Sequence, residues 1–276
     1  MNEEQLAGIA NDMRIDIVRM IAEAGSGHPG GSLSCADILS VLYFDTMKHD
    51  PSNPKNEDRD RFILAKGHAA PALYAALAES GYFPKEELAT LRKLGTRLQG
   101  HPDMNLLPGV EVSTGSLGQG LSIACGMACG MKLAGNDNTV FTLLGDGECQ
   151  EGQVWEAAMF AAHRNLDNLV AIIDRNGLQI DGKTSDVCDP GDLASKFTAF
   201  GWDAHEIDGH DVAALRDAFA KVKSERDGKP HVFIARTIKG KGVSFMEDQA
   251  GWHGKAPNVE ELEQALIDLG AAKKEA

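Results

Sequence analysis

The chain has 276 residues, of which 43% are hydrophobic, so it can bury a sizeable core as one large domain or two small ones. Its net charge is −14 and its pI is near 5.0, which argues against a nucleic-acid-binding protein because such proteins need a basic face. No apolar run approaches the length of a membrane-spanning helix and the amino terminus lacks a signal peptide, so we expect a cytoplasmic protein without membrane contact.

The first half of the chain alternates helical periodicity with glycine-rich loops. The expected elements are helices over 3–24, 34–47, 69–80, 84–94 and 113–134, and a short strand over 61–65. His28, His68 and His101 lie beside glycine, in loops or at the strand end. An imidazole in such a place can donate a hydrogen bond to a phosphate, a hydroxyl or an oxyanion, so these histidines are candidate site residues.

The segment from Thr139 to Leu178 organises the rest of the chain. It reads as a strand over 139–144, a helix over 150–163 and a strand over 169–174. The two strands of such a unit should be parallel, and their carboxyl ends then meet at the edge of the sheet where open α/β folds bind ligands. Asp146 follows the first strand and Asn176 follows the second, so we expect these two side chains to lie close together.

The chemistry of this turn favours a cation over a bare phosphate. Gly145 and Gly147 fit a dinucleotide-binding fingerprint, but Gln150 occupies the position of its third glycine. A carboxylate in a phosphate-binding turn would repel the phosphate unless a cation lay between them. Mg²⁺ and Ca²⁺ take carboxylate, amide, carbonyl and phosphate oxygens, so Asp146, Asn176 and a carbonyl just beyond it could hold a metal that holds a diphosphate. The alternative is an ordinary strand-end turn with a capping aspartate.

The second half continues the βα alternation and predicts an α/β fold with a mostly parallel sheet. The expected elements are loops over 181–191 and 239–257, helices over 193–200, 212–224 and 258–269, and strands over 203–207 and 231–236, before a solvated Lys/Glu tail. His253 lies beside glycine in the second loop and joins the candidate site residues. Gly240-Lys241-Gly242 lacks the remainder of a phosphate-loop motif.

The remaining features have ordinary structural interpretations. His49, His163, His205, His210 and His231 lack the glycine context and are read as structural. Ser122, Gly126 and Gly130 recur every four residues on one helix, which allows close helix packing either within the subunit or across a subunit interface. The five cysteines form no Cys-x-x-Cys pair, so we expect small buried thiols in a reducing compartment.

Taken together, several runs resemble the transketolase family, in the family's order and over nearly the whole chain. They are Ser26-Gly27-His28-Pro29-Gly30, Arg59-Asp60-Arg61-Phe62, Lys66-Gly67-His68-Ala69, Gly100-His101-Pro102, the run from Thr114 to Gly120, and Gly145-Asp146-Gly147 through Asn176. The resemblance is to the amino-terminal half, so residues 1–276 are expected to form one diphosphate-binding domain. The pyrimidine-binding and carboxyl-terminal domains of the family are expected on a separate partner chain.

The resemblance also implies roles for individual residues. Asp146, Asn176 and the Leu178 carbonyl would bind Mg²⁺ or Ca²⁺. His68, His253 and the Gly147 backbone would contact the phosphates of thiamine diphosphate. Gly115 and Leu117 would contact the cofactor rings through their backbone. His28, His101 and His253 would face the reacting sugar. Glu151 and Glu156 match acidic cofactor-site positions near the family's dimer interface.

The implied activity is transfer of a two-carbon ketol unit from a ketose, or its phosphate, to an aldose. In this family the acid beside the cofactor's pyrimidine lies on the domain expected elsewhere, so the chain should act only with its partner, as an α2β2 heterotetramer. The first alternative is the α-subunit of a thiamine diphosphate-dependent 2-oxo acid dehydrogenase, against which the Gly-His-Pro loops argue. The others are a non-catalytic binding protein on the same fold and a plain nucleotide-binding domain.

Overall fold

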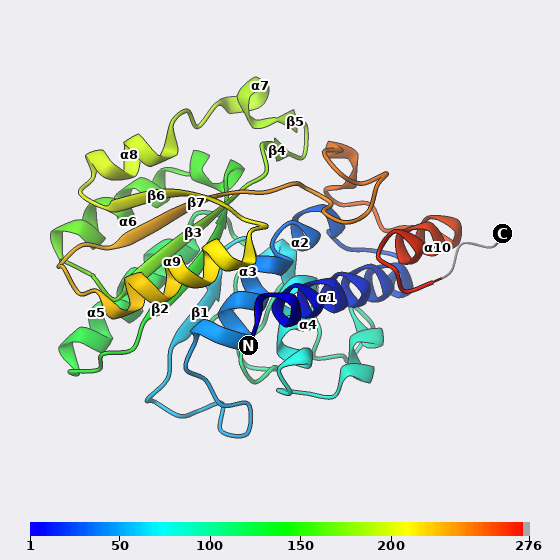
Figure 1. Ribbon diagram of the computed structural model, residues 1–276, viewed down its shortest axis with the longest axis horizontal. Helices are drawn as coiled ribbons and strands as arrows, with labels where there is room; N and C mark the ends of the chain where they lie inside the picture. The colour runs from blue at the N-terminus through cyan, green and yellow to red at the C-terminus, as the bar shows by residue number, and fades with distance from the viewer. Residues whose placement is uncertain (273–276) are drawn as a thin grey trace.

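The computed structural model describes residues 1–272 and is built on one parallel sheet (Figure 1). The strand order is β1 (Arg61–Leu64), β2 (Val140–Gly145), β3 (Leu169–Arg175), β7 (His231–Arg236) and β6 (Asp203–Asp208), and every neighbouring pair is parallel. The predicted fold class is therefore confirmed. The charged tail predicted at the end of the chain falls partly on residues 273–276, which lie outside the described residues.

Helices cover both faces of the sheet because successive strand side chains point to opposite faces. On β2, Phe141 and Leu143 join one hydrophobic core, and Val140 and Leu144 join the other. The first core packs against α1 (Glu3–Ala24), α3 (Ala36–Val41), α4 (Ala70–Glu79) and α9 (Val212–Ser224). The second packs against α5 (Gln119–Leu133), α6 (Gly152–His163) and α8 (Leu193–Ala199). Helix α10 (Val259–Asp268) lies beside α1 (Figure 1).

Several short elements differ from the sequence prediction. The first Gly-His-Pro segment is not wholly a loop, because α2 (Pro29–Leu33) begins there with proline in its first turn, where the missing N–H costs nothing. The predicted helix over 34–47 is α3 followed by a π-helical turn, Leu42–Thr46. The predicted helix over 84–94 is a 3₁₀ helix, Lys85–Thr90. The predicted loop over 181–191 contains part of a hairpin, β4 (Leu178–Gln179) and β5 (Gly182–Lys183), and α7 (Thr184–Cys188).

Helix α5 carries two kinds of glycine. A Cβ at Gly120 would lie 2.3 Å from the Cβ of Ala65, so this glycine lets the helix approach the end of β1. Gly126 and Gly130 are exposed, and a Cβ at either would meet nothing within 4 Å. Close packing inside the subunit therefore does not explain Gly126 or Gly130.

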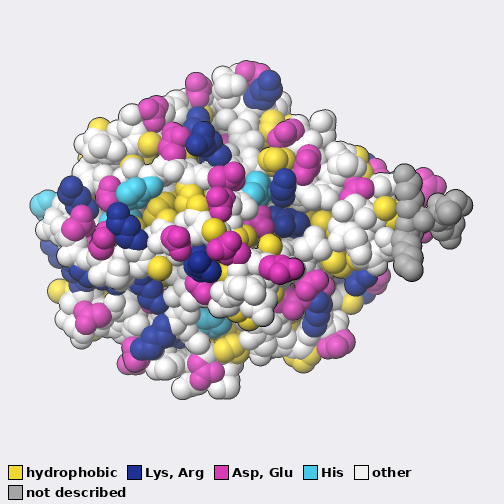
Figure 2. All heavy atoms as spheres, viewed as in Figure 1, with side chains coloured by type: hydrophobic (Ala, Val, Ile, Leu, Met, Phe, Trp, Pro, Cys, Tyr) yellow, Lys and Arg dark blue, Asp and Glu magenta, His cyan; other side chains and the backbone are white. Residues whose placement is uncertain are grey.

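The cysteines only partly follow the expectation of buried thiols. Cys35, Cys125 and Cys149 are buried free thiols, as predicted, but Cys188 is exposed at the end of α7. Among the described helices, none combines the length and the apolar character that a membrane crossing needs. Acidic and basic side chains are interspersed over the face of the molecule seen in Figure 2.

Candidate active site

The carboxyl ends of four parallel strands form the floor of a cavity of about 370 Å³. Lys66 and His68 follow β1, Asp146 follows β2, Asn176 follows β3, and Lys239 follows β7. All five residues line the cavity. It lies at the edge of the sheet where open α/β folds bind ligands, as the sequence predicted. The larger groove of the molecule, about 770 Å³ between α1, the 3₁₀ helix 85–90 and α10, holds none of these residues.

The Asp146 carboxylate is fixed by backbone N–H groups from two turns. Its Oδ1 accepts from Gly147 N at 2.8 Å, and its Oδ2 accepts from Gly177 N at 2.6 Å. Burial and the nearby Asp174 raise the pKa of Asp146 to about 6, although these two N–H groups oppose the shift. Burial destabilises the ionised form of this carboxylate, and a bound cation would stabilise that form.

Asn176 completes the turn after β3. Its Oδ1 accepts from Leu178 N at 3.1 Å, and its Nδ2 donates to Asp174 Oδ2 at 3.2 Å. The second contact fixes the orientation of the amide, so its oxygen faces the turn at Leu178. Asn176, Asp146 and Leu178 all line the cavity. Asp146, Asn176 and Leu178 thus come together as the sequence predicted, as a group of carboxylate, amide and carbonyl oxygens.

Two buried lysines line the cavity. Lys66 pairs with Asp174 and also donates to the Gly31 carbonyl at 2.6 Å. Lys239 Nζ contacts the Leu178 carbonyl at 3.2 Å and His253 Nδ1 at 2.9 Å. Burial lowers the pKa of Lys239 to about 8, whereas for Lys66 the opposite effect of Asp174 prevails and the pKa rises to about 12.

Three histidines cluster on the wall of the cavity. The ring centroids of His68 and His253 are 5.0 Å apart, and those of His28 lie 5.3 Å from His68 and 5.6 Å from His253. Burial, reinforced by neighbouring positive groups, lowers the pKa of His28 and His253 to about 4 and that of His68 to about 2. All three are therefore neutral near pH 7, and each imidazole can donate one hydrogen bond and accept another.

The other predicted site residues fall into two groups. Gly115, Leu117, Gly147 and Glu151 line the same cavity. His101 is exposed and lies against Gly115, where an added Cβ would be 2.8 Å from the imidazole Cδ2, but it does not line the cavity itself. Glu156 is exposed on α6 and does not line the cavity within this chain.

The sequence reasoning missed Lys66, Asp174, Glu148 and Lys239, all of which line the cavity. Glu148 is buried, and its carboxylate accepts from Gly118 N and Gly145 N, each at 3.0 Å, so it ties the start of α5 to the end of β2. Burial raises its pKa to about 7. Lys66 and Asp174 each stand at the end of an apolar strand, which is a signal that the sequence contained. Lys239 follows the last predicted strand in the same way.

The donor set fits a hard divalent cation and a diphosphate. The oxygens of Asp146, Asn176 and Leu178 are the ligand types that Mg²⁺ and Ca²⁺ prefer. The ammonium groups and neutral imidazoles opposite them suit phosphate oxygens. The fold and the site therefore define an α/β protein with a cavity suited to a metal-bound diphosphate.

Comparison with known proteins identifies the family. The family model "Transketolase, thiamine diphosphate binding domain" matches residues 6–276, and the chain belongs to this family. It is 46% identical to the 6-deoxy-6-sulfo-D-fructose transketolase subunit SqwG of Clostridium sp. (strain MSTE9), with 98% of each chain covered. It is 43% identical to a subunit of the apulose-4-phosphate transketolase of Phocaeicola vulgatus, over 98% of this chain and 95% of that protein.

Solved structures agree with the sequence comparisons. The crystal structure of transketolase from Campylobacter jejuni superposes with a TM-score of 0.92 at 37% identity, over 98% of this chain. The match covers 43% of the Campylobacter chain, so this chain spans less than half the length of that transketolase. The resemblance and the fold inferred from the sequence are thereby confirmed.

Proposed function

We propose that residues 1–276 form the diphosphate-binding domain of a two-subunit transketolase, which transfers a two-carbon ketol unit from a ketose phosphate to an aldose phosphate. The observation that carries this proposal is the convergence of Asp146, Asn176, Lys239 and three neutral histidines at one edge of the sheet. The family match adds thiamine diphosphate as the group that such a cavity binds.

In this proposal the cofactor is anchored through a metal. Asp146, Asn176 and the Leu178 carbonyl hold Mg²⁺ or Ca²⁺, and the backbone of Gly147 comes close to the diphosphate. His68 and His253 donate to phosphate oxygens, and the charge of Lys239 favours the anion, whereas that of Lys66 is balanced by Asp174. Gly115 and Leu117 offer backbone groups to the cofactor rings, and Glu151 lies at the cavity rim. When bound, thiamine diphosphate supplies the electron sink that cleavage of the ketose requires.

The histidines of this chain handle hydroxyl groups and their protons. A neutral imidazole at His28 or His253 can donate to a developing oxyanion or accept a proton from a sugar hydroxyl. His101, beside Gly115, would contact the part of the sugar that extends out of the cavity. Because burial keeps His28 and His253 neutral near pH 7, each is available to accept a proton.

A partner subunit completes the enzyme in this proposal. Support comes from relatives that are named as transketolase subunits and match this chain over 95–98% of their own length. The partner carries the pyrimidine-binding domain and the acid beside the pyrimidine, in a cytoplasmic α2β2 heterotetramer. The exposed Gly126 and Gly130 of α5 form a stretch suited to close approach by another subunit.

The direct test is an assay of the purified chain with thiamine diphosphate, Mg²⁺, a ketose phosphate and an aldose phosphate. We expect no turnover by the chain alone, and turnover once a subunit with the pyrimidine-binding domain is added. Robust turnover without the partner would contradict the two-subunit proposal. Oxidative decarboxylation of a 2-oxo acid by the complex, without ketol transfer, would favour the 2-oxo acid dehydrogenase alternative.

A further inference from the structure

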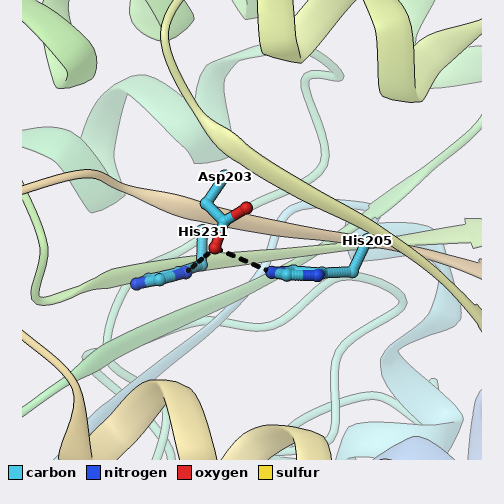
Figure 3. A group of neighbouring side chains, drawn as sticks. All are labelled: Asp203, His205 and His231. Atoms are coloured by element: carbon cyan, nitrogen blue, oxygen red, sulfur yellow. Dashed lines mark ion pairs between the residues drawn. The ribbon is translucent and has the colours of Figure 1, made fainter. Parts of the chain in front are cut away.

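A second cluster of ionisable side chains lies at the opposite end of the sheet from the cavity. Within residues 1–272, Asp203, His205 and His231 are the one group of His, Cys, Asp or Glu side chains whose ligand atoms all lie within 4.8 Å of one another (Figure 3). Asp203 and His231 begin β6 and β7, whereas the cofactor cavity lies at the carboxyl ends of the strands. The cluster is therefore separate from the proposed active site.

The strand geometry dictates this cluster. Asp203 and His205 are two residues apart on β6, so their side chains point to the same face of the sheet. His231 is the register partner of Asp203 on the neighbouring strand, and side chains at paired positions are adjacent. The His205 ring stacks on Phe233, with ring centroids 5.1 Å apart, which fixes the orientation of the imidazole.

His231 is buried, and its ring nitrogens have no hydrogen-bond partner among the described residues. Its side chain is 1% exposed. A polar group left unsatisfied at this depth destabilises the fold. Two carboxylates approach its ring nitrogens, Asp203 at 3.5 Å from Nδ1 and Asp227 at 3.9 Å from Nε2. Both separations are too long for hydrogen bonds.

Two of the three separations suit a shared metal ion, and all three ligand atoms lie within 4.8 Å of one another. Donors on a tetrahedral Zn²⁺ lie about 3.3 Å apart, given bond lengths of about 2.0–2.1 Å. Asp203 Oδ2 lies 3.1 Å from His205 Nε2 and 3.5 Å from His231 Nδ1, and Figure 3 shows both imidazoles directed at this one oxygen. The side chains of Asp203 and His205 are 43% and 37% exposed, whereas the ring nitrogens that face Asp203, His205 Nε2 and His231 Nδ1, are buried and without a hydrogen-bond partner.

We propose that Asp203, His205 and His231 bind a divalent transition-metal ion, with Zn²⁺ as the best match. Two imidazoles and a carboxylate favour a borderline ion such as Zn²⁺ over Mg²⁺ or Ca²⁺, which prefer all-oxygen sites. Asp227 lies on the far side of the His231 ring, 3.9 Å from Nε2 and beyond hydrogen-bond distance, and it adds negative charge beside the site. A small cavity of about 220 Å³ adjoins the cluster and leaves room for a water ligand; Lys221 and Glu225 also line it.

The ion would cross-link the edge strand of the sheet to the neighbouring strand. Strand β6 stands at the edge of the five-stranded sheet beside β7, and its residues are largely exposed or half-buried. A ligand that binds only the folded chain raises its stability by mass action. Zn²⁺ should therefore raise the melting temperature through contacts that involve no residue of the cofactor cavity.

The test is Zn²⁺ binding to the chelator-treated, cofactor-free chain in excess Mg²⁺, measured by competition with a chromophoric chelator and by thermal melting. Co²⁺ provides a second probe, because tetrahedral Co²⁺ absorbs in the visible range. We expect one tightly bound equivalent and a melting temperature raised by several degrees. His205→Gln is the principal variant because His205 is partly exposed, and it should weaken Zn²⁺ binding by about 100-fold or more. Asp227→Asn removes a nearby charge but no hydrogen bond, so it should weaken Zn²⁺ binding much less than His205→Gln does.

Two control variants separate this site from other histidines. His163→Gln removes an exposed histidine on α6, and His68→Gln removes one from the cofactor cavity. Both should keep the full Zn²⁺ affinity, melting shift and Co²⁺ absorption. The proposal is overturned if the unmodified chain shows no stoichiometric binding, or if His205→Gln binds Zn²⁺ as tightly as the unmodified chain. Loss of binding in His68→Gln alone would also overturn it, by assigning the ion to the cavity.

Discussion

The Lys66 ammonium and the Asp174 carboxylate form an ion pair in the floor of the cofactor cavity, with side-chain exposures of 2% and 0%. Asp174 also accepts from Ser34 and Thr237. Burial acts to raise the pKa of Asp174, but Lys66 and these hydrogen bonds outweigh it and hold the pKa below its usual value. The pair joins the ends of β1 and β3, so it fixes the frame on which Asp146 and Asn176 are placed.

Breaking this pair should be strongly destabilising. Asp174→Asn leaves the Lys66 charge buried without compensation, and we expect a loss of about 3–5 kcal/mol in the free energy of unfolding. Urea denaturation of the purified chain measures it. Glu23→Gln is the matched control, because it breaks the surface pair with Lys93 and should leave the urea midpoint unchanged. A midpoint for Asp174→Asn equal to that of the control would refute the structural role of the pair.

The proposed metal site predicts a specific defect in cofactor binding. Asp146→Ala removes the carboxylate that is expected to hold the ion, so Mg²⁺-dependent binding of thiamine diphosphate to the reconstituted complex should weaken at least ~100-fold, as expected for the loss of an inner ligand. Isothermal titration calorimetry with and without Mg²⁺ measures the change. Asp217→Asn, an exposed substitution on α9, should bind normally. Unchanged cofactor affinity in Asp146→Ala would remove the metal assignment.

Asp16, on α1, predicts a pH-dependent effect on stability. Burial, opposed by Lys85, raises its pKa to about 6 from an unfolded value of about 3.9. The folded chain therefore holds this proton more tightly than the unfolded chain does. The ionised carboxylate destabilises the fold above pH 6, and the penalty disappears as the pH falls toward 4.

Asp16→Asn should therefore stabilise the chain at pH 8 by about 1–2 kcal/mol, because the amide resembles the protonated carboxyl and carries no ionisation penalty. The gain should shrink at pH 5 and vanish near pH 4. Urea midpoints across this range test the sign. Asp12→Asn, exposed on the same helix, serves as the control. A stabilisation that grows toward acid pH would contradict the assignment.

The two kinds of glycine on α5 should respond oppositely to alanine. Gly120→Ala places a Cβ 2.3 Å from the Cβ and 2.6 Å from the Cα of Ala65, so we expect a loss of about 1–3 kcal/mol or more. Gly126→Ala meets no atom within 4 Å and should gain up to ~1 kcal/mol from helix propensity. Thermal melts of the two variants test the contrast, and equal melting temperatures would show that the approach of α5 to β1 is not tight.

Much of the fold could be read from the sequence because periodicity and strand composition agree with tertiary burial. The predicted helix over 212–224 and strand over 231–236 coincide with α9 and β7. The short helix α2 could not be predicted, because its two glycines disfavour a helix. Its conformation instead follows from packing, since a Cβ at Gly30 would lie 2.9 Å from the Lys239 Cγ.

The site was predicted less completely than the fold. Strand ends and glycines identified Asp146 and Asn176, because turn residues after parallel strands must share one edge of the sheet. Lys66 and Lys239 were missed because lysine is ordinarily a surface residue, and only the full topology shows that these two are buried. The cluster of Asp203, His205 and His231 depends on the register between β6 and β7, which no local pattern reveals.

The contact between Lys239 and the Leu178 carbonyl bears on how the anchor loads. On the proposed assignment, this oxygen already has a positive partner before a divalent ion arrives. Loading would then be an exchange, in which the Lys239 ammonium would yield this oxygen to the incoming ion. The same ammonium would afterwards be available to the diphosphate that the ion holds.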